Sequence, residues 1–294
     1  MPVQNEQFTC RTLSTPSEPP HTSSKRREKI AAMLILLDTL AATLYLWCAW
    51  RVHNAAQSAR DQGLVMGLAA AVALQGLALG LGDALQGQWK LGIGQALALF
   101  LWLCCAMHLL MCLRMSLWHL GRWLWPVAAL AVPLAWVLPQ GAANTVTLSS
   151  TLKLHILVSM LAYATLTLAA LQTLSYALLD TSLHKGQHRR SLPPLQVMED
   201  LVFKLVLIGF ILLCISIGSG FLFVDNVFAQ HLAHKTALSI IACALFGALT
   251  AGRALRGWRG RTAIRWVMGA YITLLLAYFG SKLVLEQFLG RSWT

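Results

Sequence analysis

The chain has 294 residues, of which 57% are hydrophobic and only 12% are charged, and its mean hydropathy is +0.63. Soluble domains contain about 45–50% apolar and about 25% charged residues, so this composition excludes an ordinary soluble protein. The formal net charge of +12 would suggest nucleic-acid binding in a soluble chain. Here the basic residues fall in alternate loops between apolar stretches. The sequence therefore predicts an integral membrane protein with no nucleic-acid partner.

Windows of about 20 apolar residues, the length that crosses a bilayer as a helix, mark the predicted spans. Eight windows follow one another along the chain: 30–50, 63–86, 91–113, 120–138, 152–180, 201–223, 236–254 and 264–288. The fourth window contains Pro126 and Pro133, and we expect a kinked or tilted helix there. The predicted fold class is all-α, a polytopic membrane protein with eight transmembrane helices.

The first 29 residues differ in composition from the rest of the chain. They are rich in Pro, Ser and Thr, end in the basic cluster 25–29 and have no periodic apolar face, which is typical of a disordered tail. No cleavage-type motif of small residues follows the first apolar stretch, so the tail does not resemble a signal peptide. We therefore divide the chain into a basic tail, 1–29, and a membrane domain, 30–290.

Basic residues are distributed unequally between the two sets of loops. The loops after the first, third, fifth and seventh windows contain twelve: Arg51, Arg60, Arg114, Arg122, Lys185, Arg189, Arg190, Arg253, Arg256, Arg259, Arg261 and Arg265. The other loops contain Lys90, Lys153 and Lys235. The positive-inside rule then predicts a bacterial inner-membrane protein with both ends of the bundle in the periplasm. The tail's basic cluster opposes this orientation, so either the native start lies later, as at Met33, or the tail is tolerated against the rule.

The fifth window is the most informative about function. Its apolar stretch runs from Leu154 to Leu179, 26 residues without a charged side chain. His155, at the start of this stretch, is its one histidine. Imidazole forms hydrogen bonds and binds metals, so its position at the mouth of a membrane-length helix suggests a site that faces one aqueous compartment. The alternative is a helix-end histidine that hydrogen-bonds a neighbouring carbonyl.

The second half of the chain carries a series of short motifs. In chain order they are His155-x-x-x-Ser159-x-x-x-Tyr163-Ala164, Gly218-Ser219-Gly220, Lys235 at the start of a span, Gly257-Trp258-Arg259-Gly260 and Tyr278-Phe279-Gly280. With these motifs the chain resembles the cytochrome c assembly family of membrane proteins, the CcsA-like group, and within it the YpjD-like inner-membrane branch. The resemblance covers about residues 150–288. It implies an eight-span, haem-handling protein in which His155 is an axial ligand of the haem iron.

The chain departs from the family pattern in two places. Members that deliver haem carry a loop rich in Trp that contains Asp and cradles the haem. The corresponding residues 220–235 contain no Trp and offer instead Phe221, Phe223, Asp225 and Phe228. Those members also present a second outer histidine after the final span, and here no histidine follows His234. These departures argue against formation of the thioether bond by this chain, which also has no catalytic constellation in its sequence.

A second haem ligand is therefore expected from another position. His231 and His234 share one face of a helical turn, and His234 is the preferred second ligand, with an imidazole from a partner protein as the alternative. Solvated histidines at the membrane edge are the simpler interpretation of both. Lys153 and Lys235 either pair with haem propionates or anchor helix ends at the interface, and the second role is the commoner one.

Polar residues inside the other windows have simpler explanations. His108 lies within the third window beside Met107, where an inner haem site competes with a hydrogen bond between helices, and the hydrogen bond is favoured. Asp38 must face the bundle if it lies within the hydrocarbon. A secondary transporter has polar groups that converge near the bilayer centre. In this chain the polar groups cluster at one face instead, so a transporter is disfavoured.

The function predicted from the sequence is binding, transport or holding of haem in support of c-type cytochrome assembly. The expected cofactor is haem, with His155 as its metal ligand, and the expected partners are the lipid bilayer and cytochrome c maturation proteins. The alternative is a membrane scaffold or regulatory protein that has lost haem ligation.

Overall fold

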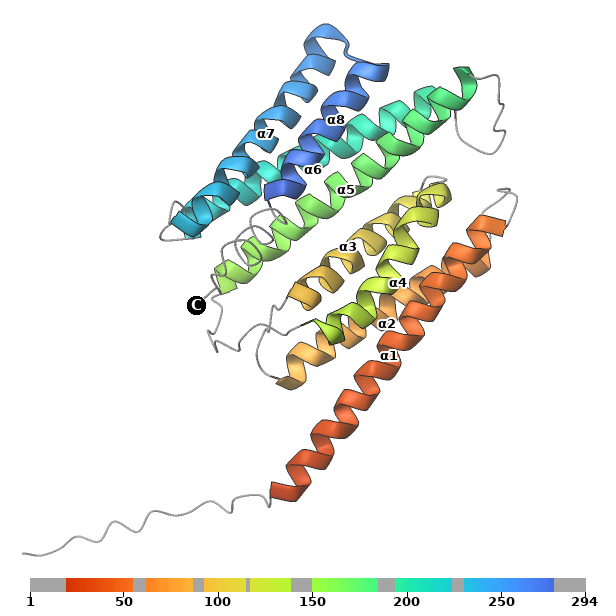
Figure 1. Cartoon of the computed structure of the whole chain (residues 1–294), viewed down its shortest axis with the longest axis vertical. Coiled ribbons are helices and arrows are strands. Elements are labelled where there is room, and N and C mark those ends of the chain that lie inside the picture. Colours follow the sequence, from red (N-terminus) through yellow and green to blue (C-terminus); the bar gives the residue numbers. More distant parts are fainter. Residues whose placement is uncertain are drawn as a thin grey trace, which may run out of the picture.

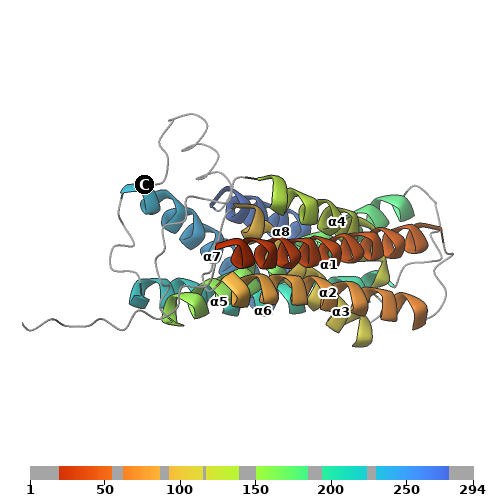
Figure 2. The same cartoon turned by 90° about the horizontal axis from the view of Figure 1, so that it is seen from below.

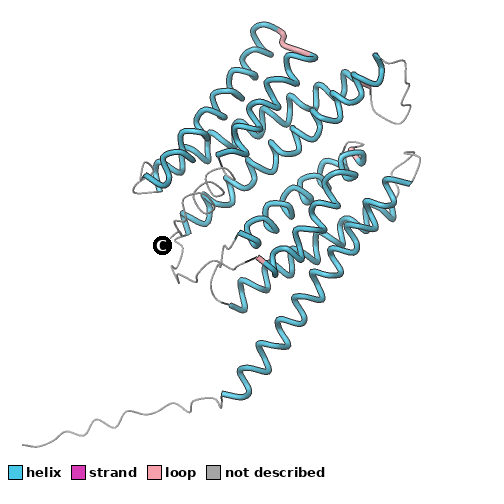
Figure 3. The backbone as a smooth tube through the Cα atoms, viewed as in Figure 1, coloured by secondary structure: helices cyan, strands magenta, loops and turns pink. Residues whose placement is uncertain are grey.

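The structure, a computed structural model, describes residues 20–54, 62–86, 93–114, 117–138, 150–184, 194–223 and 230–277. These residues contain helices and connecting segments but no strand (Figure 3), in agreement with the predicted all-α class. The elements are α1 (Pro20–Asn54), α2 (Gln62–Gln86), α3 (Ile93–Arg114), the short 3-10 helix η1 (Trp118–Leu120), α4 (Gly121–Val137), α5 (Ser150–His184), α6 (Leu195–Phe223), α7 (Gln230–Arg256) and α8 (Gly260–Leu275).

Seven of the described helices are long and apolar enough to cross a membrane, which confirms a polytopic membrane protein. They correspond to the first seven predicted windows. The eighth window, 264–288, begins within α8, and only its residues up to 277 are described. An eighth span therefore stays a prediction.

The described helices form two groups, α1 to α4 and α5 to α8, seen from two sides in Figures 1 and 2. In the first group α1 packs against α2 and α4, and α3 packs against α2 and α4. In the second group α5 packs against α6 and α8, and α7 packs against α6 and α8. Helix α3 lies against α5 and joins the two groups. A buried hydrogen bond of 3.1 Å between His119 Nε2 of η1 and Gln172 Oε1 of α5 also crosses this junction.

Successive helices run in opposite directions, so the helix termini alternate between the two ends of the bundle (Figure 1). The two ends carry different side chains. One end holds the start of α5, the end of α6 and the start of α7, with Lys153 and His155 on α5. The opposite end holds the ends of α1, α3 and α7 and the start of α8, where Arg51, Arg114 and Arg253 lie. We call the end with these arginines the basic end; His155 lies at the other end, together with the start of α1 and its basic cluster 25–29.

The motif Gly257-Trp258-Arg259-Gly260 forms the tight turn between α7 and α8. Gly257 and Gly260 have φ values of 65° and 58°, in the left-handed region that favours glycine. The Trp258 ring lies over Gly252, where an added Cβ would be 2.4 Å from it, and packs on Trp266 with ring centroids 5.0 Å apart. This motif has a structural role in the turn.

Two acidic residues of α6 hold that turn in place. Helix α6 begins at Leu195, earlier than its predicted window, and the acidic pair Glu199-Asp200 lies in its second turn. Arg253 of α7 pairs with Glu199 at 3.5 Å and with Asp200 at 3.2 Å. Glu199 Oε1 also accepts the N–H of Gly260 at 3.1 Å. The three helices α6, α7 and α8 are thereby tied at the basic end.

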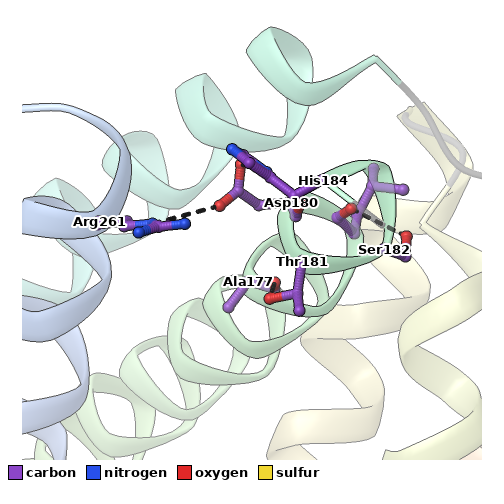
Figure 4. A network of polar contacts seen from close by, with 7 residues as sticks. Ala177, Asp180, Thr181, Ser182, His184 and Arg261 are labelled. Carbon is purple, nitrogen blue, oxygen red and sulfur yellow. Dashed lines mark hydrogen bonds and ion pairs between the residues drawn. The ribbon is translucent and has the colours of Figure 1, made fainter. Parts of the chain in front are cut away.

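A second polar contact lies nearby, at the end of α5 (Figure 4). Asp180 lies between Arg261 of α8, at 3.9 Å, and His184 of its own helix, at 3.6 Å. The Arg261 side chain is 73% exposed, so this long ion pair contributes little to stability.

Helix α1 extends beyond its predicted span. It begins at Pro20, so the basic cluster 25–29 continues directly into the apolar helix, while residues 1–19 lie outside the described part. The division into a tail, 1–29, and a domain, 30–290, stays a prediction. Asp38 of α1 accepts a 2.8 Å hydrogen bond from Trp136 Nε1 of α4, which agrees with the expectation that it faces the bundle.

Candidate functional site

His155 lies in the second turn of α5 and is half-buried against the end of α6. Its Nδ1 is 2.8 Å from Ser219 Oγ, a contact that joins two residues 64 positions apart. The partner of Nδ1 is thus a hydroxyl of the neighbouring helix and not the carbonyl that the simpler interpretation expected. The hydrogen bond fixes the direction in which the ring leaves α5.

The glycine after Ser219 allows the imidazole to lie close to α6. A Cβ added to Gly220 would be 3.3 Å from Cε1 and 3.9 Å from Nε2 of His155, whereas one added to Gly218 would meet nothing within 4 Å. The motif Gly218-Ser219-Gly220 therefore supplies a hydrogen-bond partner for one side of the ring and a bare backbone beneath the other.

Two further serines connect α5 to α6 beside the histidine. Ser159 Oγ donates to the carbonyl oxygen of His155 at 2.7 Å and lies 2.6 Å from Ser216 Oγ. Ser219 Oγ donates to the carbonyl oxygen of Ser216 at 2.9 Å. In this way the polar side chains of the site hydrogen-bond to one another inside an apolar helix pair, as buried polar groups require.

Apolar side chains at the end of α6 could contact a flat, largely apolar ligand with a metal centre held by His155. Phe221 and Leu222, which follow the motif, are 47% and 79% exposed and present apolar surface at the end of α6. A metal-ligating histidine commonly has its second ring nitrogen fixed by a hydrogen bond, and Ser219 provides such a bond here. Haem is a group of this kind, with an axial position that a histidine nitrogen can occupy.

The other predicted haem contacts fall mostly outside the described side chains. His231, His234 and Lys235 belong to the first two turns of α7 by their backbone, but their side chains lie outside the described part. The same holds for the side chain of Phe223 and for residues 224–229, which include Asp225 and Phe228. Lys153 is half-buried on α5, two residues before His155.

Among the described residues, no group of three or more His, Cys, Asp and Glu side chains could hold a metal ion. A haem iron takes its equatorial ligands from the porphyrin and only one or two axial ligands from protein, so haem ligation does not require such a group.

The polar residues of the first helix group are used in packing. Gln75 of α2 accepts the Tyr45 hydroxyl of α1 at 2.9 Å and donates to the Ala98 carbonyl of α3 at 3.4 Å. His108 Nε2 lies 3.1 Å from the Leu117 carbonyl. The hydrogen bond favoured for His108 is thus present, although it reaches the segment after α3 rather than another helix.

Sequence reasoning missed the pairing of His155 with Ser219. Both residues were singled out as motifs, but nothing in the sequence states which face of α6 meets α5. The sequence indicates only that His155 and Ser159 near the start of one window, and Ser216 and Ser219 near the end of the next, lie at the same end of two antiparallel helices.

Together, the helices and this site define a multi-pass membrane protein with a polar histidine site at one end of an apolar helix pair. The family model described as "Cytochrome C assembly protein" matches residues 64–289. The chain therefore belongs to the cytochrome c assembly protein family, and membership supports a role in c-type cytochrome biogenesis.

Two relatives are similar to most of the chain. The "Inner membrane protein YpjD" of Escherichia coli (strain K12) is 30% identical over 216 residues, 73% of this chain and 81% of the relative. The "Uncharacterized 28.8 kDa protein in nifR3-like 5'region" of Azospirillum brasilense is 31% identical over 213 residues, 69% of this chain and 79% of the relative. No solved structure matches. With the apolar helices, these similarities support a multi-pass protein of the inner membrane.

Proposed function

We propose that the protein binds haem at the His155 end of α5 and α6 and holds it for c-type cytochrome assembly. The observation that carries this proposal is the 2.8 Å contact between His155 Nδ1 and Ser219, which orients an imidazole at the rim of the bundle. Bound haem would supply a redox-active iron. The chain's own residues supply the axial imidazole, the apolar surface beside it and the bare backbone of Gly220 below its edge.

His234 is the proposed second axial ligand, with an imidazole of a partner protein as the alternative. Helix α7 begins at Gln230, so the backbone of His234 belongs to the end of the bundle that also carries His155. Helix α6 packs against both α5 and α7, which supports an approach of the two histidines from either side of α6.

The proposed orientation places the His155 end in the periplasm and the basic end in the cytoplasm. The described arginines at the ends of α1, α3 and α7 and at the start of α8 all lie opposite His155, and by the positive-inside rule they support this orientation, which the basic cluster 25–29 at the start of α1 opposes. Haem held at the outer end lies on the side of the membrane where c-type cytochromes mature, and maturation proteins are the proposed partners.

Purification in detergent followed by absorption spectroscopy tests haem binding. We expect a Soret band in the purified protein or after addition of haemin, and we expect His155→Ala to lose it. The matched control is His184→Ala, because His184 is an exposed histidine at the opposite end of the same helix. His234→Ala should alter the band without abolishing binding, since His155 remains.

The main alternative is a membrane scaffold without haem. Protein that is colourless and stays colourless with added haemin would overturn haem binding and favour the scaffold. Equal loss of the band in His155→Ala and His184→Ala would assign the effect to the fold rather than to ligation.

A further inference from the structure

Four residues of α5 and α6 form a closed ring of hydrogen bonds. His155 Nδ1 contacts Ser219 Oγ at 2.8 Å, and Ser219 Oγ contacts the Ser216 carbonyl at 2.9 Å. Ser216 Oγ contacts Ser159 Oγ at 2.6 Å, and Ser159 Oγ contacts the His155 carbonyl at 2.7 Å. This ring of hydrogen bonds thus starts and ends at His155 and passes through both α5 and α6.

The chemistry of the groups fixes the direction of every hydrogen bond in this ring. A hydroxyl has one proton to donate, and a backbone carbonyl can only accept. The Ser219 proton is given to the Ser216 carbonyl, so toward His155 the Ser219 oxygen acts as an acceptor. His155 must therefore donate from Nδ1. By the same reasoning, Ser159 gives its proton to the His155 carbonyl, and Ser216 donates to Ser159.

We infer that Ser219 is a positioning residue that holds His155 in the tautomer protonated at Nδ1, which places the ring's lone pair on Nε2. In the neutral imidazole one nitrogen donates and the other carries the lone pair, and metals bind through the lone pair. The inference rests on the proposed function only for the identity of the group that Nε2 ligates. The tautomer itself belongs to the protein without haem.

Gly220 adds an independent steric restraint on the same ring. Its added Cβ would be 3.3 Å from Cε1 and 3.9 Å from Nε2, so the ligating edge of the imidazole lies over the backbone of α6. Ser219 fixes the position of Nδ1, and Gly220 sets how closely Cε1 and Nε2 approach the backbone of α6. Rotation of the ring about its bond to Cβ would lose the Ser219 contact.

Nitrogen NMR of protein labelled with ¹⁵N-histidine, in detergent and without haem, tests the tautomer directly. The chemical shift separates a protonated from an unprotonated ring nitrogen, and the signal missing from His155→Gln identifies His155. We expect protonation at Nδ1 in the unchanged protein. In Ser219→Ala we expect a shift toward the Nε2-protonated tautomer, because the acceptor for the Nδ1 proton is removed.

Ser216→Ala is the matched control. It removes one hydroxyl from the same turn of α6, but it retains the backbone carbonyl that takes the Ser219 proton, so the His155 tautomer should stay unchanged. Ser219→Thr keeps a hydroxyl and should restore the Nδ1 signal. Protonation of His155 at Nε2 in the unchanged protein, or equal spectra for Ser219→Ala and Ser216→Ala, would overturn the inference.

Haemin titration of the same variants separates this inference from the proposed function. Ser219→Ala should weaken haemin binding by about 10–100-fold, the usual effect of removing a residue that orients a metal ligand, and by more than Ser216→Ala, which retains the carbonyl that accepts the Ser219 proton. If the unchanged protein does not bind haemin but carries its proton on Nδ1, the proposed function fails and the inference stands. If it binds haemin and the tautomer is reversed, the inference fails alone.

Discussion

Gly220 and His155 lie so close together that a methyl group at position 220 would press on the imidazole. The added Cβ would be 3.3 Å from Cε1, which is tighter than an ordinary van der Waals contact. We expect Gly220→Ala to push the ring away from α6 and strain the hydrogen bond to Ser219. Because ligand orientation controls metal affinity, haemin binding should weaken by up to about tenfold in a titration followed at the Soret band.

The control for this variant is Gly218→Ala, two residues earlier on the same helix. A Cβ at Gly218 meets nothing within 4 Å, so its affinity for haemin should match that of the unchanged protein. A haemin dissociation constant that is the same in both variants would show that the close approach at Gly220 does not position His155.

The positions of the helices could be predicted from hydropathy, but their ends could not. Helix α1 begins at Pro20 and α5 continues to His184, beyond their predicted windows, because a hydropathy window follows apolar side chains while the backbone helix continues through polar residues at the interface. The same effect starts α6 at Leu195, before its predicted window at 201.

Within the candidate site, the position of His155 at the mouth of α5 could be predicted, and its contact with Ser219 could not. An imidazole at the mouth of a membrane-length helix stands out in one sequence because polar residues are costly there. The contact with Ser219 depends on the rotation of α6 about its own axis and on its shift along α5. These are set by packing between residues far apart in the chain, so no local pattern reports them.

Arg253 gives a prediction about stability. Its guanidinium pairs with Glu199, whose side chain is 13% exposed, and donates to the Trp258 carbonyl at 3.3 Å. Arg253→Gln should lower the free energy of unfolding by about 1–3 kcal/mol, since it leaves a largely buried carboxylate without its charged partner. Thermal unfolding in detergent measures the loss. Arg256→Gln, at an exposed arginine one turn further along α7, should leave stability nearly unchanged, and a similar loss in both variants would contradict this role.

Two glycines near α8 should respond to the same substitution with opposite signs. Gly257 has a φ of 65°, where a side chain costs about 1–2 kcal/mol, so Gly257→Ala should destabilise the protein by that amount. Gly269 lies inside α8, and a Cβ there meets nothing within 4 Å. Gly269→Ala should therefore stabilise the protein by about 0.5–1 kcal/mol. A Gly257→Ala protein that unfolds at the same temperature as the unchanged protein, or at a higher one, would contradict the left-handed turn.

Reporter fusions test which end of the bundle faces the periplasm. Bacterial alkaline phosphatase becomes active only where its disulfides form, which is in the periplasm. A fusion after residue 294 should be active, and a fusion within 185–193, the loop with Lys185, Arg189 and Arg190, should be inactive because basic loops stay in the cytoplasm. Since α5 ends just before that loop and starts beside His155, the inactive loop fusion places His155 at the outer surface. The reverse pattern would put the imidazole at the cytoplasmic face, where an outer haem site in cytochrome c assembly could not lie.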